Sequence, residues 1–112
     1  MEHPFDVVVE ERGDLVLVCL TGEFDLAAAE AIETTLLPLE ARFRTVILDL
    51  RGVSFLDSTG LRAIVSADAR SRERGFQLKI VRGPEHVQKL LHVSGLDQIL
   101  PLVDADELPA PT

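Results

Sequence analysis

The 112-residue chain has little of the chemistry on which disulfide scaffolds and metal sites depend. Its single cysteine, Cys19, has no partner thiol, and a small buried residue explains it better than a reactive group. Tryptophan and tyrosine are absent, and there are three histidines, one of which, His3, lies in the N-terminal tail. The other two, His86 and His92, stand six residues apart on a predicted helix and so point to different faces. We interpret them as surface residues rather than metal ligands or catalytic bases.

Long apolar segments and an excess of basic charge are also missing. No apolar run approaches the roughly 18 residues needed to span a membrane, and residues 1–4 lack the features of a signal peptide. We therefore expect a cytoplasmic protein. The net charge of −8 disfavours nucleic acids and anionic membranes as partners, because both would be repelled at long range. A protein partner fits the charge better, and a monomer is the expected oligomeric state.

The usual enzyme motifs are absent as well. Neither the phosphate-binding Gly-x-x-x-x-Gly-Lys-Ser/Thr loop nor Gly-x-Gly-x-x-Gly occurs, and no Gly-x-Ser-x-Gly sequence supports a serine hydrolase. Asp25, Asp49 and Asp57 fall near predicted strand ends, which in an open α/β sheet can gather them at one edge. Helix capping explains Asp25 and Asp57 equally well. We predict no catalytic residue, metal site or cofactor.

The hydrophobic pattern predicts a single α/β domain over residues 1–103, followed by a disordered, acidic and proline-rich tail at 104–112. We expect a mixed sheet of four to five strands that begins with a β-hairpin, and about three helices that cover both faces. Residues 21–25 are expected to form a loop, and Pro38 to end or kink the first helix. The predicted strands are 5–10, 15–20, 45–50, 76–81 and 99–103, and the predicted helices are 26–37, 61–74 and 84–93.

The second helix carries both an apolar face and several arginines. Its spacing predicts an inner face made by Leu61, Ile64, Val65 and Ala69. The charged residues of the same helix are expected to be largely outward and solvated. They are Arg62, Asp68, Arg70, Arg72, Glu73 and Arg74.

Residues 53–61, Val-Ser-Phe-Leu-Asp-Ser-Thr-Gly-Leu, are the centre of the prediction. They join a buried strand to a helix, which makes Asp57 the N-cap and places Ser58 in the first turn. The first turn of a helix offers unpaired N–H groups and the positive end of the macrodipole, so the fold can accept a phosphate on Ser58. Ser58 is therefore a candidate phosphorylation switch. Taken alone, however, these residues are better explained as a capped helix start.

The wider sequence changes that interpretation. The motif Asp-Ser-Thr-Gly-Leu at 57–61 follows Leu-Asp-Leu at 48–50 and Leu-Thr-Gly-Glu-Phe-Asp-Leu at 20–26, and together they resemble the anti-sigma factor antagonists of the STAS family. The resemblance covers roughly residues 5–103. It implies that Ser58 is phosphorylated by an anti-sigma factor that is itself a serine kinase. The unphosphorylated antagonist would bind this kinase and release the sigma factor, and a serine phosphatase acting on Ser58 would restore binding.

The resemblance also implies which residues contact the partner. Gly22, Glu23 and Asp25 belong to a loop beside the phosphorylated corner, and Arg62 departs from the small residue that is common at its position. The sequence leaves open whether Thr59 is modified instead of Ser58. The predicted partner-binding residues are Gly22, Glu23, Asp25, Asp57, Ser58, Thr59, Gly60 and Arg62.

Two other functions remain open at this level. A constitutive STAS scaffold, or an accessory subunit of a larger complex, would use the same helix face with Ser58 as an ordinary helix-start residue. A small hydrolase would require turnover that disappears when Ser58 is replaced by alanine. The leading hypothesis is a binding protein without catalysis, switched by phosphorylation.

Overall fold

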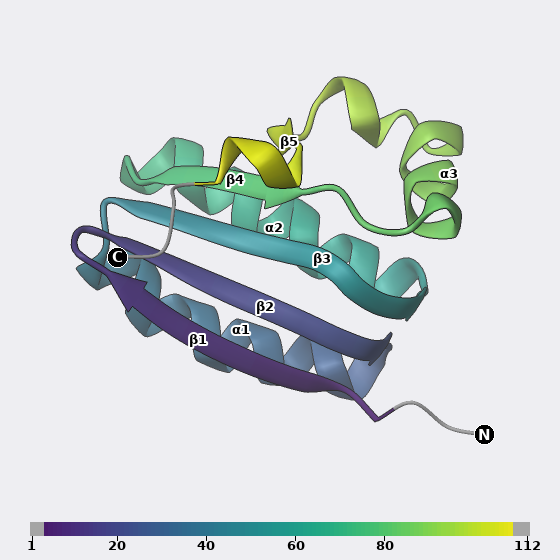
Figure 1. Cartoon of the computed structure of the whole chain (residues 1–112), viewed down its shortest axis with the longest axis horizontal. Helices are drawn as coiled ribbons and strands as arrows, with labels where there is room; N and C mark the ends of the chain where they lie inside the picture. The colour runs from purple at the N-terminus through teal and green to yellow at the C-terminus, as the bar shows by residue number, and fades with distance from the viewer. Residues whose placement is uncertain (1–3, 109–112) are drawn as a thin grey trace.

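The computed structural model describes residues 4–108 and contains a five-stranded mixed sheet in the order β1-β2-β3-β4-β5. β1 pairs with β2 in antiparallel orientation and forms the N-terminal hairpin, while the other neighbouring strands are parallel. The predicted α/β fold with a mixed sheet, hairpin and three helices is confirmed (Figure 1). The strands are β1 Asp6–Arg12, β2 Leu15–Phe24, β3 Thr45–Leu56, β4 Gln77–Val81 and β5 Leu102–Val103. The helices are α1 Leu26–Arg42, α2 Ser58–Arg74 and α3 Glu85–Val93, with short 3-10 turns η1 Leu96–Gln98 and η2 Ala105–Glu107.

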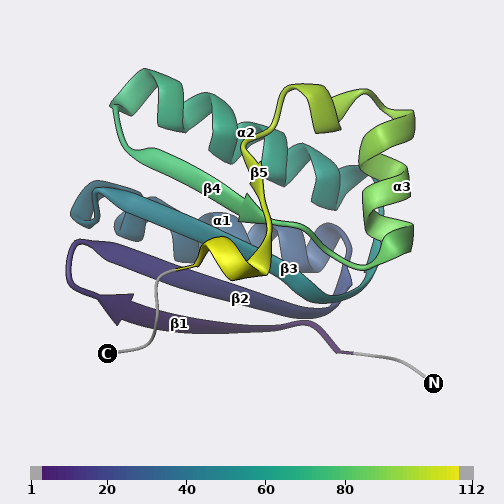
Figure 2. The same ribbon diagram turned by 45° about the horizontal axis from the view of Figure 1, so that its top comes forward.

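The α-helices cover one face of the sheet, not both as expected. α1 and α2 lie against the same face, and the second view shows η2 crossing the opposite one (Figure 2). On that second face Leu17, Ile47 and Val81 form a small apolar cluster against Ala105 and Leu108. Alternate side chains in the first half of β3 serve the two faces: Val46, Leu48 and Leu50 belong to the large core and Ile47 to the small cluster. Asp49 is the charged exception in this run.

The segment after β5 is ordered as far as it is described. The Arg82 guanidinium pairs with Asp104 at 2.8 Å, and the Arg82 N–H donates to the Val103 carbonyl at 3.0 Å. Asp104 and Glu107 form a reciprocal capping box around η2. Residues 104–108 therefore differ from the expected disordered tail because they cover the second apolar cluster. Residues 109–112 lie outside the described residues.

Several elements extend beyond their predicted ends, and β3, predicted to end at residue 50, runs to Leu56. Residues 21–24 continue β2 instead of forming a loop, and they pair with β3 through two register shifts. α1 runs through Pro38 to Arg42, because buried Leu36 and Leu39 hold the last turns against the core and offset the missing proline N–H. At the other end of the chain, the last strand is shorter than predicted and comprises two residues.

The predicted inner face of α2 is partly wrong. Val65 and Ala69 are exposed, whereas Ala63 and Ala67 are buried and bring α2 close to the core. Arg70 is not solvated: its guanidinium bonds Glu40 at 2.7 and 2.8 Å and Glu33 at 3.1 Å, all three side chains lying between α1 and α2.

Charged and apolar contacts thus join the two helices. Asp68 is likewise buried and pairs with Arg72. The hydrophobic pattern could not predict that Arg70 and Asp68 are buried, because charged side chains are buried only where they find a partner of opposite charge.

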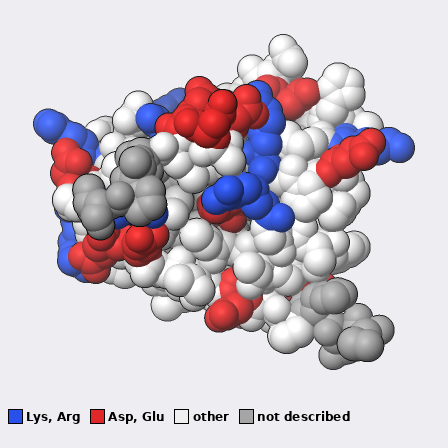
Figure 3. All heavy atoms as spheres, viewed as in Figure 1, with Lys and Arg blue, Asp and Glu red and all other residues white. Residues whose placement is uncertain are grey.

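Cys19 also departs from the expected core position. It lies half-buried on the second face, where its thiol is 3.8 Å from a carboxylate oxygen of Asp49. Burial raises the pKa of the Cys19 thiol, and the neighbouring Asp49 charge raises it further. Basic and acidic side chains are interspersed on this face (Figure 3).

Candidate functional site

Two parallel strands end side by side, and a helix begins immediately after each. β2 and β3 are paired up to their last residues, with Phe24 opposite Leu56. An aspartate N-cap follows each strand: Asp25 precedes α1 and Asp57 precedes α2. The Asp57 N–H also approaches the Phe24 carbonyl at 3.4 Å, which ties the two corners together. The sheet register therefore places both helix starts at one edge of the molecule.

Asp57 organises the second corner through a single carboxylate oxygen. Its Oδ1 accepts hydrogen bonds from the Thr59 N–H at 3.0 Å, the Gly60 N–H at 2.9 Å and the Thr59 hydroxyl at 2.6 Å. These bonds, led by that of the Thr59 hydroxyl, lower the pKa of Asp57. The corner thus holds an ionised carboxylate beside Ser58 at neutral pH.

The two adjacent hydroxyls of the corner are not equivalent. Ser58 is exposed, and within the described residues its hydroxyl has no hydrogen-bond partner. The Thr59 hydroxyl is half-buried and already donates to Asp57. Of the two candidates that the sequence left open, Ser58 has the more accessible nucleophilic oxygen.

Gly60 lets the start of α2 approach the end of β2. A Cβ built on Gly60 would lie 2.5 Å from the Phe24 carbonyl oxygen and 2.7 Å from side-chain carbons of Phe24 and Leu56. Real Cβ atoms essentially never approach so closely, so any side chain here requires a shift. Gly22 is required for a different reason, since it is buried with a positive φ of 87°.

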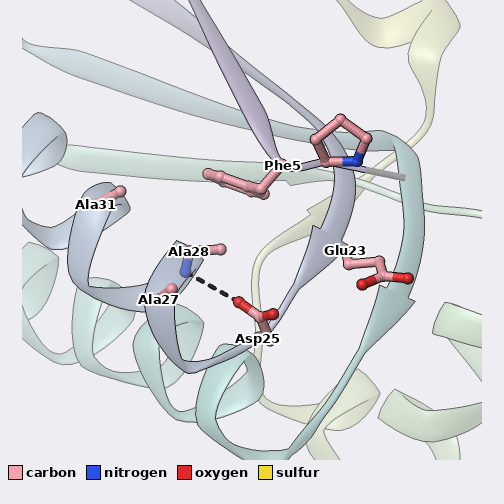
Figure 4. Close-up of a pocket in the computed structure, with 7 residues that line it drawn as sticks. Phe5, Glu23, Asp25, Ala27, Ala28 and Ala31 are labelled. Atoms are coloured by element: carbon pink, nitrogen blue, oxygen red, sulfur yellow. Dashed lines mark hydrogen bonds between the residues drawn. The ribbon is translucent and has the colours of Figure 1, made fainter. Parts of the chain in front are cut away.

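A hollow of about 410 Å³ lies beside the first corner (Figure 4). The Asp25 carboxylate accepts a hydrogen bond from the Ala28 N–H at 3.1 Å (Figure 4). Glu23, near the end of β2, also lines the hollow. The Phe5 ring packs on Phe24 with 5.4 Å between the ring centroids. The lining of the hollow therefore combines two acidic residues with apolar walls, which suits a basic or amphipathic side chain of a partner. Its lining residues are Pro4, Phe5, Glu23, Asp25, Ala27, Ala28 and Ala31.

A second, shallower hollow of about 210 Å³ lies between α1 and α2. Arg62, which the sequence singled out, lines it together with Thr59. Sequence reasoning missed Leu26 and Glu30, which line the opposite wall. The sequence did contain one signal for Leu26, since it is an apolar residue directly after a predicted N-cap. In the structure its side chain is 59% exposed and lines the hollow.

The structure brings only two of the three aspartates of interest to this edge. Asp49 lies on the second face of the sheet, where it binds the Arg51 guanidinium at 2.7 Å. Burial favours a raised pKa of Asp49, but the hydrogen bonds from Arg51 outweigh it and the pKa is lowered. Asp49 is therefore explained by this ion pair.

The histidines and a remaining acidic cluster lie elsewhere. His86 and His92 are both exposed on α3, and His92 lies 2.8 Å from Asp97. His3 lies outside the described residues. The exposed carboxylates of Asp104, Asp106 and Glu107 come within 4.8 Å of one another, but two of these three residues already form the capping box around η2.

Comparison with known proteins identifies the family. The model of the STAS domain family matches residues 6–107 of this chain. The chain belongs to the STAS domain family. It is 28% identical over 95 residues to the anti-sigma-B factor antagonist of Bacillus subtilis, covering 85% of this chain and 87% of that protein.

Solved structures agree with this assignment. An anti-sigma factor antagonist from Mycobacterium paratuberculosis superposes with a TM-score of 0.79 at 25% identity, over 93% of this chain and 90% of that one. The fold of unphosphorylated SpoIIAA, an anti-sigma factor antagonist, is also similar, with a TM-score of 0.77 at 23% identity and coverage of 91% and 90%. These STAS relatives are regulatory binding proteins, not enzymes. Within residues 4–108, no helix of this STAS protein has the length and apolar character needed to cross a bilayer.

Proposed function

We propose that this protein is an anti-sigma factor antagonist whose binding is switched by phosphorylation of Ser58. In the unphosphorylated form it binds an anti-sigma factor with serine kinase activity and thereby frees a sigma factor. A serine phosphatase acting on Ser58 reverses the modification. The observation that carries this proposal is the exposed, unbonded Ser58 hydroxyl beside a neighbouring Thr59 hydroxyl that is already engaged.

The surface around Ser58 supports a protein partner rather than a small substrate. Two hollows flank the first turns of α1, and the second of them also reaches Thr59 and Arg62 at the start of α2. The Glu23 and Asp25 carboxylates in the larger hollow are suited to basic side chains of the partner. The proposed footprint joins these residues and Gly22 to residues 57–60 and Arg62.

The effect of phosphorylation on folding and on binding should differ. A phosphate adds about −1.5 to −2 charges, and the start of a helix stabilises such a group by ~0.3 to 1 kcal/mol at an exposed site. In a docked interface the phosphate must instead be desolvated next to ionised Asp57. An uncompensated buried charge costs on the order of 3 to 5 kcal/mol, which is more than a hundredfold in affinity. Binding is therefore lost while the fold persists.

A pull-down from host lysate with two baits tests this function. Ser58→Ala should capture a serine kinase, and Ser58→Glu should capture far less, because the added charge lies in the interface. Gln77→Glu is the matched control: it adds one charge with little change in shape, and Gln77 pairs with Thr45 at the opposite end of β3. It should capture as much as the unmodified protein.

The captured kinase then allows a direct measurement. Calorimetry with the protein carrying phosphoserine at position 58 should show binding at least about a hundredfold weaker than the unmodified protein. Equal affinity of the two forms would refute the switch. Capture of the same proteins by both baits would favour the constitutive scaffold or accessory subunit instead.

A further inference from the structure

The hollow between α1 and α2 is lined by an arginine, Arg62, whose charge has no partner within the described residues. Glu30 and Glu33 line this hollow from α1, and Arg62 lines it from α2. Glu33 is already bonded to Arg70 at 3.1 Å. Arg62 is exposed, and it has no hydrogen bond or ion pair within the described part of the chain. Its guanidinium is therefore available to a new anion.

Ser58 stands four residues before Arg62 on the same helix. Residues with this spacing lie on one face, about one turn apart, and opposite charges placed there attract each other. A guanidinium also matches phosphate oxygens in a forked, two-bond geometry that a lysine cannot reproduce. We propose that Arg62 is the intramolecular counter-ion of phosphorylated Ser58. This inference rests on the proposed phosphorylation and names the residue that receives the phosphate.

The charges around Arg62 determine what the contact changes. Before modification, Arg62 faces the Glu30 and Glu33 carboxylates across the hollow, and Asp57 is the anion beside Ser58. A phosphate group, which itself carries nearly two negative charges, attracts the guanidinium more strongly than a single carboxylate does. Arg62 then turns from the hollow toward the phosphate. The hollow loses its cation, so phosphorylation alters the charge of both the corner and the neighbouring groove.

The charges around the phosphate have opposite effects on its second pKa. Asp57, Glu30 and Glu33 disfavour the dianion and raise its second pKa, whereas Arg62 stabilises the dianion and lowers that pKa. Arg70 is the other cation near this wall, but it is committed to Glu33 and Glu40. Removal of the Arg62 charge should therefore shift the titration of the phosphate upward.

Phosphorus NMR titration of the full chain tests this proposal. Phosphoserine is incorporated at position 58 during translation, so no kinase is required. The change Arg62→Gln should raise the second pKa of the phosphate by about 0.3, and Glu30→Gln should lower it. The control is Arg74→Gln, which removes the same charge from a position sixteen residues beyond Ser58 on α2, about 24 Å from the phosphate and beyond the screening length. It should leave the titration unchanged.

A second set of measurements separates this contact from a general structural effect. The unphosphorylated Arg62→Gln protein should melt like the unmodified protein, because Arg62 is exposed. Arg62→Lys should give an intermediate titration, since it keeps the charge but loses the fork. If Arg62→Gln titrates like Arg74→Gln, the proposed contact does not form. Failure of the binding switch, in contrast, would appear as equal affinity of the phosphorylated and unphosphorylated forms and would leave this titration unaffected.

Discussion

The two strand-to-helix corners of this STAS domain have the same plan but different chemistry. Each joins the end of a parallel strand to an aspartate N-cap and a 17-residue helix. Asp25 accepts one backbone N–H, that of Ala28, whereas Asp57 accepts two N–H groups and a hydroxyl. The first helical residue is Leu26 in one corner and Ser58 in the other. The same backbone therefore presents an apolar group at one place and a hydroxyl at the neighbouring one.

The third helical position shows why the second corner is the more constrained. Ala28 occupies it in α1 and Gly60 in α2. The Cβ that Ala28 carries would lie 2.5 Å from the Phe24 carbonyl if it were added at Gly60. The second corner is thus pressed against the end of β2, which holds Ser58 at a fixed place beside the first corner. A fixed position is what a surface needs if one phosphate is to decide between binding and release.

The largest expected effect on stability comes from Gly60→Ala, which gives both corners an alanine at the third helical position. The new methyl group overlaps the Phe24 carbonyl, so the helix or the strand end must shift, at a cost of about 1 to 3 kcal/mol. Urea unfolding should show the loss as a lower midpoint with an unchanged slope. The matched change Ala28→Gly tests the other corner, where the loss is about 1 kcal/mol of helix propensity together with the contacts of one buried methyl group. A Gly60→Ala protein as stable as the original would show that the close approach is not a constraint.

The features that could be predicted from sequence are those that local chemistry determines. Asp57 as the N-cap and Ser58 in the first helical turn were both placed correctly, because caps depend on a few neighbouring residues. The apolar run at 45–50 likewise predicted the central strand. Local signals were sufficient for the corner that carries the proposed function.

The features that could not be predicted depend on contacts between distant segments. β2 continues through residues 21–24 because β3 lies beside it, and α1 passes Pro38 because its last turns pack on the core. The burial of Arg70 requires two glutamates that are 30 and 37 residues away in the chain. Sequence periodicity contains no information about such pairs, and it therefore assigned Arg70 to a solvated face.

A smaller effect is expected when the two caps are removed in turn. Asp25→Ala should destabilise the protein by about 1 kcal/mol, since one N–H bond is lost. Asp57→Ala should lower the melting temperature more, because it leaves two N–H groups and the Thr59 hydroxyl without their acceptor. Thermal unfolding followed by circular dichroism compares the two variants under one condition. Equal losses would mean that the additional bonds of Asp57 add no stability.

The charge of Asp57 should also make stability depend on pH. Its hydrogen bonds lower its pKa in the folded state below the ordinary value near 3.8, so ionised Asp57 favours folding above that pH. The contribution is lost as the pH falls through the folded-state pKa. Asp57→Asn keeps a capping side chain but cannot ionise. Its stability deficit at pH 7 should therefore shrink below about pH 4 in urea unfolding series, whereas a constant deficit would contradict a lowered pKa.

The smallest effect on stability is expected from exchanging the residues that distinguish the two corners. Ser58 is exposed and unbonded and Leu26 is largely exposed, so Leu26→Ser combined with Ser58→Ala should change stability by no more than about 0.5 kcal/mol per site. The hydroxyl would then stand beside an aspartate N-cap at the start of a helix, as before, but in the other corner. If the partner kinase recognises the local cap alone, mass spectrometry should detect phosphate on the exchanged protein. Loss of phosphorylation despite an unchanged melting temperature would instead show that the kinase requires what only the second corner supplies, namely ionised Asp57, the engaged Thr59 hydroxyl and the close approach at Gly60.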